Sequence, residues 1–252
     1  MLFTTDKQTL EDLNIFGKHG SDSLFTIFNR CSTRGGAAIL EEMFKYPLSD
    51  EQLINRRSGI IQYFAARNTD FPFAISDFDA IDPYLSNIDE RTKLTIRDHS
   101  LGKKLGDMIA RDVETLVIHK GIIALAELLR TFHQFIRSLE LTAGDSYQPE
   151  AAAISKILTT PEFIPVLGHG KEKMAAITMA EFDLTFRFRH RDKIQKLLRH
   201  IFELDVYLSV AKVARSRQFI FPKALPKGGN EMILGGVYHP QLKDAVGNSI
   251  RI

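Results

Sequence analysis

Cationic side chains are concentrated between positions 187 and 200 (RFRHRDKIQKLLRH), where Asp192 is the one acid. Lysine and arginine in such a run can neutralise the phosphates of a nucleic-acid backbone, and this is the chemistry that the segment favours. The net charge of the chain is only +2, so DNA binding would depend on this local patch. The alternative is a solvated helix face with no ligand. The residues that would contact DNA are Arg187, Arg189, Arg191, Lys193, Lys196 and Arg199.

Other chemistries have less support in the sequence. A phosphate-binding P-loop requires Gly-x-x-x-x-Gly-Lys-Ser/Thr, because backbone N–H groups and the lysine meet the phosphates. The segment 168–171 (GHGK) lacks that spacing and the hydroxyl residue, so we interpret it as a loop. The aspartates between 70 and 82 lack the glycine and glutamate of a calcium loop and are expected at caps and turns. Cys31 is the single cysteine, which excludes an intrachain disulfide. We expect no bound metal and no catalytic residues in this chain.

The elements that must position these residues are mostly helices. In the opening block, 9–61, apolar residues recur at helical spacing in two runs, one around Ile27 and one around Leu40. Thr33 is expected to cap the second helix, and Pro47 to end it. Asp50 then begins the acidic first turn of another helix.

The rest of the chain predicts two long helices and a different C-terminal segment. One helix is expected over 107–141, with a break near 119–121, and one over 173–215, which would carry the cations. Short strands are predicted at 232–234 and 249–252. The predicted fold is therefore mainly α, a multi-helix bundle with long helices and a short β-containing C-terminal segment. We divide it into a helical domain, 1–217, and a β segment, 218–252.

The sequence contains no recognisable targeting signal or membrane-spanning segment. No run reaches the roughly 20 apolar residues that would span a bilayer, and the N-terminus lacks a signal pattern. We therefore expect a cytoplasmic protein without a membrane partner. The chain stops inside its last predicted strand, which we expect to mark a domain boundary.

Three separated segments resemble the MutS family of DNA mismatch-repair ATPases, in the family's order. The first is the opening block. The second, 202–214 (FELDVYLSVAKVA), is similar to the family's helix that returns to the ATPase domain. The third joins 238–240 (YHP) to 246–250 (VGNSI) and looks like the stretch just before the Walker A loop. The residues that carry the resemblance are Thr33, Gly36, Pro47, Asp50, Arg56, Leu204, Asp205, His239, Pro240 and Asn248.

The resemblance implies the helical core and lever domain, domain III, of a MutS-like protein. The resemblance implies that the chain couples the binding of double-stranded DNA to an ATPase domain, which is expected soon after Ile252. That domain would bind ATP and Mg. The full-length protein would be a homodimer. The fragment itself would bind no cofactor and would not be an enzyme. Several features depart from the family: Ala38 and Tyr238 each stand where the family has an arginine, and the interval 141–173 is too short for the DNA-gripping clamp. The alternative is therefore a protein-interaction or dimerisation module of a MutS offshoot with no direct DNA contact.

Overall fold

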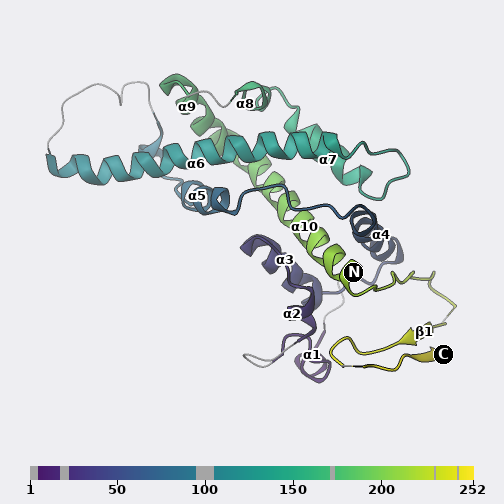
Figure 1. Cartoon of the computed structure of the whole chain (residues 1–252). Helices are drawn as coiled ribbons and strands as arrows, with labels where there is room; N and C mark the ends of the chain where they lie inside the picture. The colour runs from purple at the N-terminus through teal and green to yellow at the C-terminus, as the bar shows by residue number, and fades with distance from the viewer. Residues whose placement is uncertain (1–4, 18–22, 95–104, 171–173, 230, 243) are drawn as a thin grey trace. The chain divides into compact units, whose positions relative to one another are not determined.

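A computed structural model describes residues 5–17, 23–94, 105–170, 174–229, 231–242 and 244–252 (Figure 1). Helices dominate it, with one two-stranded sheet near the C-terminus, which confirms the mainly α prediction. By packing, the chain forms two compact units. Unit 1 is Met1–Phe71 with Phe202–Ile252, and unit 2 is Pro72–Ile201. The β segment thus groups with unit 1, and the division at 217/218 stays a prediction. Within the described residues, no helix is long and apolar enough to cross a membrane.

Unit 1 is built on short N-terminal helices and the end of a long one. Its helices are α1 (Lys7–Asp12), α2 (Leu24–Phe28), α3 (Arg34–Lys45), α4 (Glu51–Arg67) and the C-terminal part of α10 (Arg191–Ser216). Thr33 caps α3 as predicted, and its side chain accepts from the Gly36 N–H. Asp50, expected in the first turn of the next helix, instead caps α4, and its side chain accepts from the Leu53 N–H. Ile39, Leu40 and Val206 form the core between α3 and α10.

The predicted strands are present and pair with each other. β1 (Ile233–Val237) and β2 (Asn248–Arg251) run antiparallel, with Ile233 opposite Arg251 and Leu234 opposite Ile250. The register shifts between Leu234 and Val237, where Gly236 adopts a φ of +61°. A bulge at a glycine with positive φ is a common way to bend such a hairpin.

Unit 2 is organised around α6 (Leu105–Ser138), which spans 34 residues. The helix α5 (Ile75–Ser86) lies along it (Figure 1), and α7 (Gln148–Leu158), α8 (Ile164–Gly168) and α9 (Ala176–Asp183) also pack against it. The short helix η1 (Glu90–Thr92) follows α5. Fully buried side chains of unit 2 include Tyr84, Leu125, Phe132, Phe163 and Phe186.

The break expected near 119–121 is wrong, because α6 is continuous there. Gly121 has another purpose: a Cβ built on it would lie 2.2 Å from the Cβ of Tyr84 in α5. Glycine is therefore needed for the close approach of two helices, and its low helix propensity is offset by this packing.

The single helix expected over 173–215 is also wrong. α9 ends at Asp183, a π-helical turn η3 (Leu184–Arg189) follows, and α10 begins at Arg191. The His190 N–H donates to the Thr185 carbonyl, five residues earlier, at 2.9 Å. Spacing could not reveal this turn, because the buried positions keep a helical rhythm across it. Lys173, the predicted start, lies outside the described residues.

We predict that Gly121→Ala lowers the free energy of unfolding by about 2 kcal/mol, because the new methyl group forces α5 and α6 apart. Urea denaturation followed by circular dichroism measures this. Gly144→Ala is the matched control, since a Cβ there meets nothing within 4 Å. Equal stability of the two variants would contradict the close approach of α5 and α6.

Candidate nucleic-acid interface and the corner that supports it

The side chain of Asp205, on α10, holds the corner that precedes α3. One carboxylate oxygen accepts from the Ser32 N–H at 2.9 Å, and the other from the Thr33 N–H at 2.8 Å and the Thr33 hydroxyl at 2.7 Å. The same hydroxyl oxygen accepts from the Gly36 N–H at 2.9 Å. Asp205 is 1% exposed, so these bonds replace water that the carboxylate has lost. Two residues that carried the MutS resemblance, 172 positions apart, are therefore bonded partners.

The two glycines of the corner allow the helices to meet this closely. A Cβ on Gly36 would lie 2.4 Å from Oδ2 of Asp205, and one on Gly35 would lie 2.6 Å from the ring of Phe202. Both contacts are shorter than any side chain tolerates. The glycines therefore place the first turn of α3 directly against α10.

Ser209 extends the same arrangement by one helical turn. Its hydroxyl donates to the Phe28 carbonyl at 2.8 Å and accepts from the Arg30 N–H at 2.7 Å. Asp205 and Ser209 thus bind the 28–33 segment at four backbone positions, from one face of α10. Sequence reasoning did not single out Ser209. The available signal was its position four residues after Asp205 in an otherwise apolar helix face.

Burial governs the electrostatics of this corner. It raises the pKa of the Asp205 carboxyl, and the bonds from Ser32 and Thr33 oppose that rise. Burial, reinforced by the charge of Asp205, raises the pKa of the Cys31 thiol to about 12. Cys31 is therefore a protonated thiol at neutral pH and packs with the core around Ile39 and Leu40.

The remaining residues of the resemblance take structural positions in unit 1. Arg56 is exposed on α4, whereas Leu204 is fully buried on α10. The Pro240 carbonyl accepts from the Arg217 guanidinium at 2.9 Å. Asn248, in β2, pairs with Val237 of β1. Pro47 follows the last turn of α3, and His239 precedes Pro240.

Arg187, the first of the cations predicted to contact DNA, points into unit 2. It is 1% exposed, and its guanidinium donates to both oxygens of Asp183 at 2.6 Å. It also donates to the carbonyls of Asn87 and Thr92, each at 3.0 Å. The prediction that Arg187 contacts DNA is therefore wrong, because a buried guanidinium that is hydrogen-bonded within the protein cannot reach a phosphate.

The other predicted cations divide into two groups. Arg191 donates to the Leu85 carbonyl at 2.6 Å, and Lys193 forms an ion pair with Glu162, so both are partly used within unit 2. Arg189, Lys196 and Arg199 have exposed side chains. On α10, Lys196 and Arg199 are three residues apart and lie on the same face. Arg189 lies before α10, at the end of η3. We call Lys196 and Arg199 of α10, together with Arg189, the α10 basic face.

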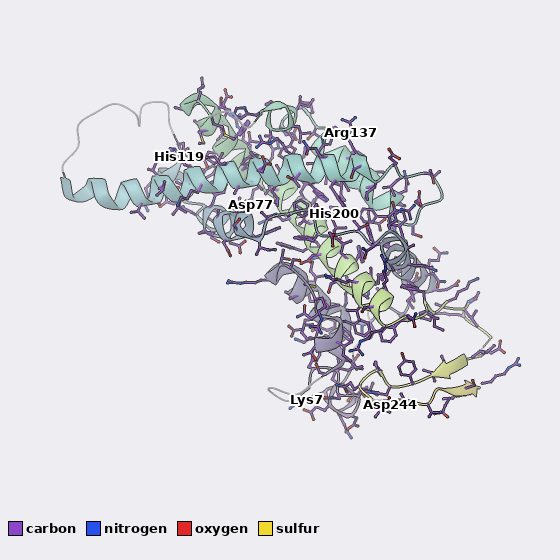
Figure 2. All side chains as sticks on the ribbon, viewed as in Figure 1. Lys7, Asp77, His119, Arg137, His200 and Asp244 are labelled. Carbon is purple, nitrogen blue, oxygen red and sulfur yellow. The ribbon has the colours of Figure 1, made fainter. Side chains whose placement is uncertain are left out.

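Unit 2 also contains an open cavity of about 1120 Å³ between α5, α6 and α9. Figure 2 labels two of its lining residues, Asp77 on α5 and His119 on α6. Burial, with the nearby charge of Glu127, raises the pKa of Asp77. Glu127 pairs with Arg130, whose guanidinium also donates to the His169 carbonyl at 2.6 Å. Two charged groups in the lining, Glu127 and Arg130, are therefore bound to each other, and Arg130 is also bound to the backbone. The segment predicted as a loop begins at Gly168, where α8 ends, and its Lys171 lies outside the described residues.

We predict that Asp205→Ala lowers the free energy of unfolding by about 3 kcal/mol, because the Ser32 and Thr33 N–H groups lose their buried acceptor. Urea denaturation measures the change. Asp70→Ala, at an exposed loop position of the same unit, is the control and should change stability by less than about 0.5 kcal/mol. If Asp205→Ala lowers the free energy of unfolding no more than Asp70→Ala does, the corner contributes little to the stability of the fold.

A family model described as MutS domain III matches residues 8–211, which include nearly all of α1, the helices α2 to α9 and most of α10. No curated protein matches the chain. The match covers Thr33, Gly36 and Asp205, the residues that meet at the corner. The chain therefore belongs to the MutS family and contains its helical core and lever domain, domain III.

Proposed function

We propose that this chain is the lever of a MutS-like protein and couples DNA contact to an ATPase domain that follows it. Membership in a mismatch-repair family supports this proposal. The observation that carries it is α10, a helix of 26 residues that contributes to both compact units. At about 1.5 Å per residue such a helix is roughly 39 Å long.

The two parts of α10 carry different functional residues. Its N-terminal part carries Lys196 and Arg199, and its C-terminal part carries Asp205 and Ser209, which hold the corner before α3. A displacement of one end of a helix is carried to the other, because the backbone hydrogen bonds resist stretching. Nucleotide-dependent movement of a downstream domain would therefore reach the α10 basic face through this helix.

The α10 basic face is the proposed contact with double-stranded DNA. Exposed arginine and lysine neutralise phosphates without reading sequence, which suits a part that positions DNA. ATP and Mg belong, in this proposal, to the downstream ATPase domain, and the complete protein acts as a cytoplasmic homodimer. A gene in which no P-loop follows the codon of Ile252 would overturn the coupling role.

A protein-interaction role is the second candidate, and one observation favours it. On α6, Val113, Leu116 and Ile123 are 59%, 52% and 48% exposed. Their spacing of three and seven residues puts them on one stripe, as in helices that pack against a partner. Self-association of the chain through this stripe, without DNA binding, would favour the second candidate. Light scattering at increasing protein concentration measures that association.

We predict that changing Arg189, Lys196 and Arg199 together to Glu weakens binding to a duplex about tenfold or more at low salt. Gel-shift titration measures the affinity. The matched control changes Lys7, Arg137 and Lys156 to Glu, because these exposed cations lie elsewhere and the net charge falls by the same amount. Equal weakening by both variants would show an effect of net charge alone and would remove the α10 basic face as the contact.

A further inference from the structure

A second basic surface lies in unit 1, at the end of α10 and in the segment that follows it. The sequence from 206 to 230 contains no aspartate or glutamate. Its cations are Lys212, Arg215, Arg217, Lys223 and Lys227, and all five are exposed. We call these five residues the basic tract. None of them was among the residues predicted to contact DNA, because the densest charge run lies earlier in the chain.

The segment that carries the basic tract is bound to α4. The Asn55 side chain donates to the Ala224 carbonyl at 3.0 Å and accepts from the Ala224 N–H at 2.8 Å. The Ser58 hydroxyl adds a longer bond to the Pro222 carbonyl, at 3.4 Å. This pairing fixes the backbone on both sides of Lys223.

Aromatic packing and a further hydrogen bond hold the start of the segment. The ring of Phe219 lies 6.0 Å from that of Phe28 and 6.5 Å from that of Tyr238. Arg217 reaches the Pro240 carbonyl at 2.9 Å. Phe219 therefore packs within unit 1, whereas Ile220 and Leu225 are 84% and 50% exposed. Lys212, Arg215 and Lys223 are also exposed to solvent.

The acids that flank the basic tract do not compensate its charge. Asp205 lies before it and is buried in the corner with Ser32 and Thr33. Glu231 lies after it and pairs with Arg251 at 3.0 Å. A segment whose charged residues are all positive and whose backbone is held in place attracts a polyanion, and the attraction is strongest for a partner with closely spaced charges.

We infer that the basic tract is a second binding site for the phosphate backbone of duplex DNA. Double-stranded DNA carries one charge per roughly 1.7 Å of its axis, which several adjacent cations can neutralise together. The core of a protein–protein interface is depleted of charge, whereas five exposed cations lie along this segment beside the exposed Ile220 and Leu225. The inference rests on the proposed function only in taking DNA as the partner. It assigns the contact to unit 1 and needs no movement of α10.

The test compares three variants of the full 252-residue chain in duplex binding, measured by fluorescence anisotropy from low to moderate salt. The first changes Lys212, Arg215 and Lys223 to Gln. The second changes Lys7, Arg137 and Lys156 to Gln and is the control for net charge. The third changes the α10 basic face, Arg189, Lys196 and Arg199, to Gln. All nine side chains lie at the surface, and circular dichroism with urea denaturation verifies that each variant folds.

If the basic tract binds DNA, the first variant should bind the duplex at least tenfold more weakly at low salt. The affinity of the control should change by less than about twofold. The slope of log K against log salt should become shallower by about 2 to 3, because each lost phosphate contact removes about 0.9. If the first variant behaves as the control does, the inference fails, and a loss confined to the third variant would leave the proposed function standing. If the first variant alone loses affinity, the inference stands and the α10 basic face is not the contact. Absence of duplex binding by the unmodified chain, or tighter binding to polyglutamate or anionic vesicles, overturns the inference.

Discussion

The structure of unit 1 depends on one buried carboxylate. Asp205 lies on α10 among apolar side chains, and its charge is balanced by hydrogen bonds from Ser32 and Thr33 at the start of α3. Loss of those donors would leave a charge inside the protein without a partner, which is among the most costly defects a fold can contain. The corner and the helix therefore specify each other, and the Gly36 position follows from the space that the carboxylate requires.

Unit 2 also contains a buried aspartate that accepts hydrogen bonds from a distant segment. Asp183, at the end of α9, accepts from the Tyr84 hydroxyl at 3.0 Å, from the Leu94 N–H at 3.1 Å and from Arg187. Burial raises the pKa of the Tyr84 phenol, so this group stays protonated and remains a donor. In both units a buried aspartate on one helix accepts at least one hydrogen bond from the backbone of an earlier segment. Such pairings specify which segments meet, even where their net contribution to stability is small.

The sequence allowed prediction of the elements that depend on local patterns. Thr33 and Asp50 were identified as helix starts, and the strands at both ends of the final hairpin were found, because caps and alternation are local signals. Gly121 was interpreted as a break because glycine has a low helix propensity. Its actual role could not be predicted, because its partner Tyr84 is distant in sequence. The inward direction of Arg187 was missed for a similar reason, since its partners Asn87 and Thr92 lie about a hundred residues away. The basic run thus indicated the helix, whereas tertiary packing decided which of its cations are exposed.

The measurement that tests this account most directly is amide hydrogen exchange at Ser32 and Thr33. Both N–H groups lie in a connection between short helices, where exchange is ordinarily fast. If the Asp205 carboxylate holds them as described, they should exchange as slowly as amides in the buried middle of α10. Exchange at the rate of an exposed loop, with α10 still protected, would contradict the claim that this buried carboxylate joins the corner to the helix.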